Sequence, residues 1–228
     1  MRDPAGYQLA GGAGGGAAAH VWYCAYGSNM HASRLAYYAE GGTPPGTGHT
    51  YPGFRDRTPP LKTTPLTLPG TIYFAWQSLV WTGGVAFYTD HPNNSWPPGA
   101  AARGYLLTRQ QFSDLLTQEM YRIPGETPEF DIDAVLDSGR VQFGPGRYET
   151  VVHVGDLEGF PVLTFTSPWD PATVELQKPS ARYLGMLTAG LRESHRWGRD
   201  QTFDYLSELP GVQGHWERSE LYALTGTV

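Results

Sequence analysis

The chain has a single cysteine, Cys24, among its 228 residues. One cysteine excludes an internal disulfide framework and any metal site built from several cysteines. No apolar run reaches the roughly 18 residues that a membrane-spanning helix requires. Basic residues are also few, with 16 Lys and Arg against 22 Asp and Glu and a net charge of −6. We therefore expect no nucleic-acid partner and no membrane partner, since both would favour a basic surface.

The first 19 residues are rich in Gly and Ala and lack the charged start and apolar core of a secretory signal peptide. We interpret residues 1–19 as a disordered extension. Residues 20–228 are interpreted as a single domain with insertions at about 42–69 and 122–147, long enough to bury a sizeable core. We expect a cytoplasmic protein, and the sequence leaves open whether it is a monomer or a homodimer.

Aromatic residues are numerous, with seven Trp and 14 Tyr. They either line a site or an interface or fill a β-rich core, and the sequence favours neither reading over the other.

The pattern along the chain predicts both strands and helices. A cap at Ser28 or Asn29 predicts a helix to about residue 40, and Thr108 with Gln111 forms a capping-box pattern. Strands are expected at 20–26, 71–76, 85–88, 102–107, 148–154 and 162–165, and helices at 109–120, 132–136, 180–195 and 200–209. Strands first and helices later favour an α+β domain with a mixed or barrel-like sheet.

The predicted helix at 109–120 places a carboxylate on its apolar face. Phe112, Leu115, Leu116 and Glu119 stand at i, i+3, i+4 and i+7, which is one side of a helix. Desolvation there would raise the pKa of Glu119, which suits a general acid/base. The alternative is that Glu119 reaches the surface or pairs with Arg122.

The turn Tyr26-Gly27-Ser28-Asn29-Met30 follows a predicted strand. A small-residue turn before a helix directs backbone N–H groups toward an anion, and Ser28 and Asn29 add side-chain donors. Such a turn fits a carboxylate or a carbonyl oxygen that gains negative charge. It also fits an ordinary capped connection between strand and helix.

Four colinear stretches resemble the gamma-glutamylcyclotransferases. They are Tyr26-Gly27-Ser28-Asn29-Met30, Trp81-Thr82-Gly83-Gly84-Val85-Ala86, Leu115-Leu116-Thr117-Gln118-Glu119, and Pro179-Ser180-Ala181-Arg182-Tyr183-Leu184 followed by Ala189-Gly190. The resemblance spans about residues 21–198.

The resemblance implies a small barrel-like sheet flanked by helices, with no metal and no organic cofactor. It implies an intramolecular aminolysis that converts a gamma-glutamyl amide into 5-oxoproline and a free amine. Glu119 would be the acid/base, the turn at 26–30 would bind the glutamyl group, and Tyr148 and Tyr183 would be hydrogen-bonding wall residues. The partner is then a small gamma-glutamyl substrate.

This chain departs from the family pattern. Met120 and Tyr121 follow Glu119 where the family has glycine, and about 28 residues separate Glu119 from Tyr148. These differences bear on the leaving amine more than on the chemistry. Two other functions remain possible: a metal-independent amide hydrolase in the same pocket, and a non-catalytic small-molecule binding module.

Other candidate chemistry is weaker. Cys24 lies in a predicted strand beside Trp22 and Tyr23, so we expect a buried and inert thiol rather than a nucleophile. The seven histidines are scattered without metal-ligand spacing, so we expect no zinc site. Asp131 before Ile132 is expected to cap a short helix.

Overall fold

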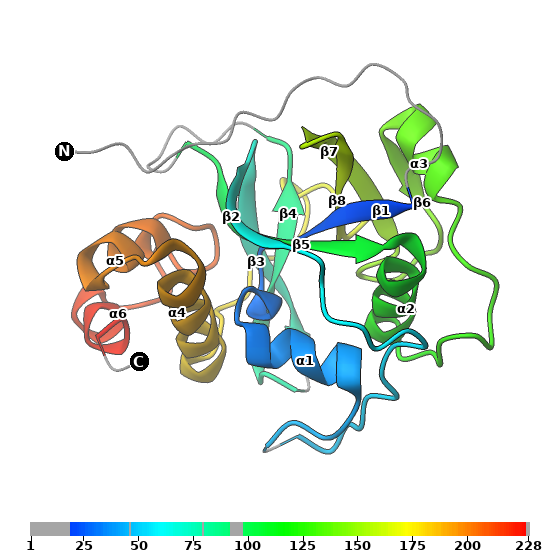
Figure 1. Cartoon of the computed structure of the whole chain (residues 1–228). Helices are drawn as coiled ribbons and strands as arrows, with labels where there is room; N and C mark the ends of the chain where they lie inside the picture. The colour runs from blue at the N-terminus through cyan, green and yellow to red at the C-terminus, as the bar shows by residue number, and fades with distance from the viewer. Residues whose placement is uncertain (1–18, 46, 79, 92–97, 227–228) are drawn as a thin grey trace. The chain divides into compact units, whose positions relative to one another are not determined.

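The computed structural model describes residues 19–45, 47–78, 80–91 and 98–226 (Figure 1). The chain forms two compact units. Of the described residues, unit 1 contains those within 19–25, 33–66 and 104–168, and unit 2 contains those within 26–32, 67–103 and 169–226. The predicted extension, apart from residue 19, lies outside the described residues.

One six-stranded sheet has the order β2-β5-β1-β8-β7-β6. Four of its strands lie in unit 1, and β2 and β5 each have residues in both units. β1 runs parallel to β8, with Trp22 opposite Val162, whereas β6 and β8 both run antiparallel to β7. The strands are β1 (His20–Ala25), β2 (Thr63–Leu68), β5 (Ala100–Thr108), β6 (Arg140–Gln142), β7 (Thr150–Leu157) and β8 (Phe160–Thr166). The α+β class and the mixed sheet are therefore confirmed. Among the described strands the sheet ends at β2 and β6, so it is not closed into a barrel.

Helix α2 (Arg109–Glu119) packs against the sheet at β1 (Figure 1). Its capping box forms as predicted, because Gln111 N donates to Thr108 Oγ1 at 3.1 Å and Thr108 N donates to Gln111 Oε1 at 3.0 Å. Unit 1 also contains most of α1 (Ala32–Glu40) and all of α3 (Ile132–Ser138), whose predicted cap Asp131 accepts a hydrogen bond from Ala134 N at 3.0 Å.

The core of unit 1 lies between α2 and the sheet. It combines alternate residues of β1 with the apolar face of α2 and with residues of the neighbouring strands, among them Val21, Tyr23, Ala25, Tyr105, Leu107, Phe112, Leu115, Leu116, Leu163 and Phe165. The ring of Tyr23 stacks on Phe165 with centroids 5.3 Å apart. Many of the aromatic residues therefore fill a β-rich core, one of the two readings that the sequence left open.

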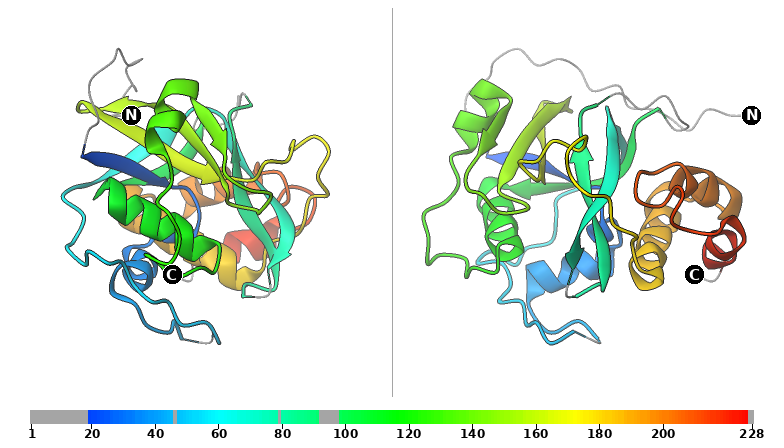
Figure 2. Two further views of the ribbon diagram at one scale, coloured as in Figure 1. Left: turned by 90° about the vertical axis from the view of Figure 1, so that its right-hand side faces the viewer. Right: turned by 180° about the vertical axis from the view of Figure 1, so that it is seen from behind.

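Unit 2 is built from a hairpin and a group of helices. β3 (Thr71–Ser78) and β4 (Gly83–Thr89) pair antiparallel, with a β-bulge between Ala75 and Gln77. Helices α4 (Ala181–His195), α5 (Arg199–Ser207) and α6 (Arg218–Leu224) contact one another (Figure 2). None of the helices among the described residues is long and apolar enough to cross a membrane.

Four local predictions need correction. The single helix expected from Ser28 to about residue 40 is divided at His31, whose backbone is extended, into a 3-10 turn η1 (Ser28–Met30) and α1. The excursion at 42–69 contains β2, and β6 and α6 were not predicted. These three segments are short, or have little alternation of apolar and polar residues, so the sequence pattern alone does not reveal them.

Gly83 and Gly84 lie where two backbones approach closely within unit 2. Gly84 N donates to Lys178 O at 2.9 Å, so the segment before α4 runs beside β4. A Cβ atom on Gly84 would stand 2.2 Å from Gln177 O, and one on Gly83 would stand 2.7 Å from Lys178 O. The two glycines are required here by space.

We predict that Gly84→Ala lowers the free energy of unfolding by about 1–3 kcal/mol, because the new methyl group overlaps a backbone carbonyl. The matched control is Gly185→Ala in α4, where a Cβ would meet nothing within 4 Å. The control should raise stability by about 0.5–1 kcal/mol, since alanine favours the helix interior. Urea denaturation of both variants measures the difference, and equal stabilities would contradict the close approach.

Candidate functional site

The turn at 26–30 begins directly after β1 and belongs to unit 2. Gly27 is the N-cap of η1, with no side-chain capping bond, and its carbonyl accepts a hydrogen bond from Met30 N at 3.0 Å. Gly27 and Ser28 are half-exposed, whereas Asn29 and Met30 are buried. The accessible part of the turn is therefore Gly27 with the Ser28 hydroxyl.

Two sets of contacts within unit 2 hold the turn in place. A Cβ on Gly190 of α4 would stand 2.7 Å from the Cβ of Met30, so this glycine allows α4 to pack closely against η1. On the other side of Met30, Arg103 donates to Met30 O at 3.2 Å and to Glu193 Oε1 at 2.7 Å. Glu193 Oε2 in turn accepts a hydrogen bond from Ala32 N at 3.1 Å. The turn is thus held against α4 by the packing of Met30 on Gly190 and by Arg103, which bonds to both Met30 and Glu193.

Tyr183 lies beside this turn. Its hydroxyl oxygen accepts a hydrogen bond from Ala86 N at 3.2 Å and would stand 3.1 Å from a Cβ on Gly27. The Tyr183 ring packs against Trp81, with centroids 5.1 Å apart. Three of the four sequence stretches that carry the family resemblance therefore meet around the Tyr183 hydroxyl in unit 2.

Tyr26 makes a different contact from the rest of the turn. Its side chain is 5% exposed and its ring lies 6.0 Å from that of Tyr88 on β4. Tyr26 and Met30 contribute to the packing of unit 2, and their assignment as substrate-binding residues stays a prediction.

Glu119 is the last residue of α2 in unit 1. Phe112, Leu115 and Leu116 are fully buried on the same helix face, and Glu119 is half-buried at its end. The apolar residues of the predicted face are therefore buried, as are the other residues of α2 from Gln111 to Gln118. The alternative partner Arg122 instead donates to Glu149 Oε1 at 2.7 Å.

Charged and hydroxyl groups of unit 1 surround Glu119. The negative charge of Glu119 acts on Arg34, Tyr38 and Arg147, and contributes to raising the pKa of each. For Tyr38, burial is the first cause and the Glu119 charge is the second. For the two arginines, burial lowers the pKa, and neighbouring groups raise it by more. These groups are Tyr38, Tyr51 and Glu119 for Arg34, and Tyr121, Tyr148 and Glu119 for Arg147. The carboxylate thus shares its surroundings with two guanidinium groups and a tyrosine hydroxyl.

Arg34 is buried in this cluster together with Tyr38 and Tyr51. Its guanidinium carbon lies 5.1 Å from the ring centroid of Tyr38 and 4.8 Å from that of Tyr51, and it donates to the Tyr51 hydroxyl. The whole residue is 6% exposed. Two tyrosine faces and a hydroxyl compensate the guanidinium charge at a depth where an uncompensated cation is costly.

The two predicted insertions contribute to the same cluster. His49 and Tyr51, from the excursion at 42–69, contact each other edge to face at 4.5 Å, and His49 contacts Tyr121 at 5.1 Å. Arg147 donates to the Tyr121 hydroxyl at 2.7 Å and lies 5.7 Å from the ring of the predicted wall residue Tyr148. Glu119 and Tyr148 are therefore linked through Arg147.

Sequence reasoning missed most of this cluster, namely Arg34, Tyr38, His49, Tyr51, Tyr121 and Arg147. The one available signal was Arg34 and Tyr38 at i and i+4 of a helix, a spacing that places a guanidinium near an aromatic ring. The remaining members are far apart in sequence, and only the fold brings them together.

The structure places the predicted site residues within each unit as follows. Unit 1 contains Glu119 and Tyr148, and unit 2 contains the 26–30 turn and Tyr183. Cys24 is fully buried in β1, as predicted, and burial raises the pKa of its thiol far above the usual range. Among the described residues no group of three His, Cys, Asp or Glu side chains is arranged to hold a metal ion.

Comparison with known proteins gives one sequence similarity. The chain is 30% identical to histone deacetylase 5 of Arabidopsis thaliana over 202 residues, which is 82% of this chain and 30% of that protein. The chain therefore spans less than a third of the length of that relative. No protein-family model matches the chain.

Two solved structures are also similar. One is an uncharacterised protein from Homo sapiens, at 15% identity and a TM-score of 0.49, covering 91% of this chain and 99% of that one. The other is a gamma-glutamyl cyclotransferase, at 16% identity and a TM-score of 0.46, covering 90% and 98%. Both TM-scores lie below 0.5, so neither similarity establishes a reaction.

The environment of His49 gives a testable pH dependence. Burial, and then the positive charge of Arg34, lower the pKa of His49 below its usual value of 6.5. The unfolded chain therefore binds a proton at higher pH than the folded chain, and this residue reduces stability as the pH falls below about 6.5. We predict that His49→Asn shows a smaller loss of unfolding free energy between pH 7 and pH 5, measured by urea denaturation. An unchanged loss would contradict the placement of His49 beside Arg34.

Proposed function

We propose that this protein is a cofactor-independent gamma-glutamyl cyclotransferase, with Glu119 as its acid/base. The observation that carries the proposal is the position of Glu119 at the end of the buried face of α2, among Arg34, Tyr38 and Arg147. In the proposed role the carboxylate accepts and returns a proton, and the two guanidinium groups are its charged neighbours. The four colinear sequence stretches support the same reaction class.

In the proposed reaction the substrate supplies its own nucleophile. The α-amino nitrogen of a gamma-glutamyl amide attacks the γ-carbonyl carbon, and a ring C–N bond forms. The original amide C–N bond then breaks and the amine leaves, so the products are 5-oxoproline and the free amine. Glu119 takes a proton from the α-ammonium group and returns one to the departing nitrogen, so no water or cofactor is consumed.

We assign the 26–30 turn as the binding site of the glutamyl group of the substrate. Gly27 permits close approach of a ligand to the backbone, and the half-exposed Ser28 carries a hydroxyl donor. Backbone N–H groups of the turn would stabilise the oxygen on which negative charge develops. Tyr148 and Tyr183 keep their proposed assignment as hydrogen-bonding residues for the substrate.

We predict that Glu119→Gln lowers turnover by about 10²–10⁴-fold while the protein stays folded, because glutamine keeps the shape but cannot relay a proton. The measurement is mass spectrometry of gamma-glutamyl peptides and gamma-glutamyl amines incubated with each protein. The matched control is Glu126→Gln, an exposed glutamate of unit 1. It should leave turnover at the level of the unmodified chain.

The products discriminate among the three candidate functions. 5-Oxoproline formed by the unmodified chain and lost in Glu119→Gln supports the cyclotransferase. Free glutamate in its place would mean that water is the nucleophile and that the protein is a hydrolase. A ligand that binds but is recovered intact would identify a binding module. Near-normal 5-oxoproline production by Glu119→Gln would refute the role of Glu119.

We predict that Ser28→Ala lowers kcat/KM by roughly 10- to 150-fold, because it removes one hydrogen bond to a charged group, worth about 1.5–3 kcal/mol. Ser219→Ala, at an exposed position of α6, is the control and should have no effect. Steady-state kinetics on the best substrate of the panel measures both variants. An unchanged kcat/KM in Ser28→Ala would argue against the turn as the binding site of the glutamyl group.

A further inference from the structure

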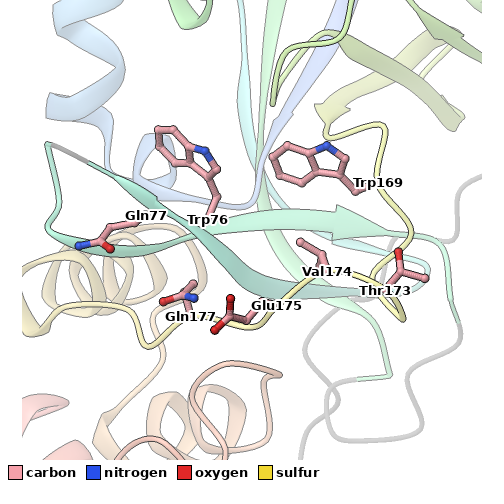
Figure 3. Close-up of a pocket in the computed structure, with 7 residues that line it drawn as sticks. All are labelled: Trp76, Gln77, Trp169, Thr173, Val174, Glu175 and Gln177. Atoms are coloured by element: carbon pink, nitrogen blue, oxygen red, sulfur yellow. The ribbon is translucent and has the colours of Figure 1, made fainter.

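A cavity lies entirely within unit 2. It has a volume of about 350 Å³ and is lined by Trp76, Gln77, Trp169, Thr173, Val174, Glu175 and Gln177 (Figure 3). The volume is in the range of small-ligand pockets. None of the lining residues belongs to the site assigned above.

The β-bulge in β3 turns Trp76 toward this cavity. Ile72 to Ala75 are buried, whereas the next two residues, Trp76 and Gln77, are both exposed, so the normal alternation of the strand is broken. Trp76 has a positive φ of 55°, an outlier for a bulky residue. Backbone outliers of this kind gather at ligand-binding positions, and bulges often redirect a side chain there.

The segment opposite Trp76 is held in register with β3. Leu176 forms an antiparallel bridge with Ala75, and Gln177 N donates to Phe74 O at 2.9 Å. Because successive side chains of an extended segment alternate, Glu175 and Gln177 project to the side opposite Leu176. Both line the cavity together with the two indole rings (Figure 3).

Trp169 and the turn that follows it are also fixed. The Trp169 ring packs edge to face on the buried Phe87, with centroids 5.2 Å apart. Asp170 O accepts hydrogen bonds from Thr173 N and Val174 N at 3.0 and 3.2 Å, and Asp170 Oδ1 accepts one from Ala172 N at 2.8 Å. These bonds order the chain between Trp169 and Glu175, so the cavity wall is formed before any ligand arrives.

The residues that line the cavity favour a cationic ligand. Indole is the aromatic group with the strongest attraction for cations, and two of them line this cavity. The carboxylate of Glu175 is the only formally charged group among the seven lining residues. The two glutamines add amide groups for a hydroxyl or carbonyl of the ligand.

We propose that this cavity binds a small organic ammonium ion, held by the indole rings of Trp76 and Trp169 and by the carboxylate of Glu175. The proposal concerns a site separate from Glu119 and does not depend on the cyclotransferase reaction. Its ligand class is an alkylammonium group that carries a neutral hydrogen-bonding substituent.

The test uses choline as the probe and its neutral carbon analogue, 3,3-dimethylbutan-1-ol, as the matched control ligand. Isothermal titration calorimetry on the full chain should detect choline and not the alcohol, because only choline carries the positive charge. Raising the salt concentration should weaken choline binding, since Glu175 is exposed. Equal binding of the two compounds, or no binding of choline, would overturn the proposal.

Variants test the named residues. Trp76→Ala should weaken choline binding by roughly 3- to 30-fold, the usual range of one cation–π contact, with Trp76→Phe in between. Glu175→Gln should weaken it by roughly 2- to 5-fold, because it removes one exposed ion pair. Glu208→Gln, an exposed carboxylate of unit 2 outside the cavity, should bind choline as the unmodified chain does. Thermal melting verifies that each variant is folded.

A sugar is the alternative ligand, because indole faces and amide groups also suit a pyranose ring. Methyl glucoside is therefore titrated in parallel. Binding of the glucoside without choline would replace the ammonium assignment with a carbohydrate site. An equal effect of Glu208→Gln and Glu175→Gln would mean that choline responds to net charge rather than to this cavity, and would also refute the proposal.

Discussion

The burial of β1 is the constraint on which unit 1 depends. This strand lies between β5 and β8, and every residue from Val21 to Ala25 is at most 3% exposed. Its parallel pairing with β8 joins two segments about 140 residues apart in the chain. Helix α2 packs against one face of β1. The strand therefore also determines the position of the end of that helix, where Glu119 lies. A buried, inert Cys24 is a consequence of the same packing.

Compensation of buried charge is the second organising principle of unit 1. Arg34 is buried between two tyrosine rings, Arg122 pairs with Glu149, and Arg55 donates to the nearly inaccessible Asp114 at 2.7 Å. The buried groups here are the Arg34 guanidinium and the carboxylates of Glu149 and Asp114, and each has a partner because an isolated buried charge is costly. Glu119 lies among several of these groups. These charged and aromatic groups are the surroundings on which the proposed role of Glu119 in proton transfer depends.

Close backbone approach organises unit 2. Gly84 and Gly190 each occupy a position where a Cβ atom would collide with a neighbouring segment, and the segments that they bring together carry Tyr183 and the 26–30 turn. Sequence stretches far apart in the chain thus meet around one tyrosine hydroxyl. The bulge at Trp76 is a further irregularity of the same hairpin. It lies beside the cavity of unit 2 that is lined by Trp76, Trp169 and Glu175.

Local signals in the sequence determined most of the regular elements. The capping box at Thr108, the cap at Ser180 and the apolar spacing of Phe112, Leu115 and Leu116 depend on neighbouring residues, so α2 and α4 could be predicted closely. The same spacing located Glu119 on the buried side of its helix. The turn at 26–30 was also evident, although its division from α1 at His31 was not.

The surroundings of these residues depend on contacts between segments that are far apart in the sequence. Arg34, His49, Tyr51 and Arg147 come from segments that show no shared pattern, and the contacts among them arise because the sheet brings its connecting segments together. The open sheet order, with β2 and β6 at its ends, likewise depends on pairing between distant strands. Periodicity and capping act over a few residues, whereas pairing and charge compensation act across the whole chain. Local sequence patterns therefore account for most of the elements and for the position of Glu119 on α2, whereas contacts between distant segments account for the charges and rings around that carboxylate.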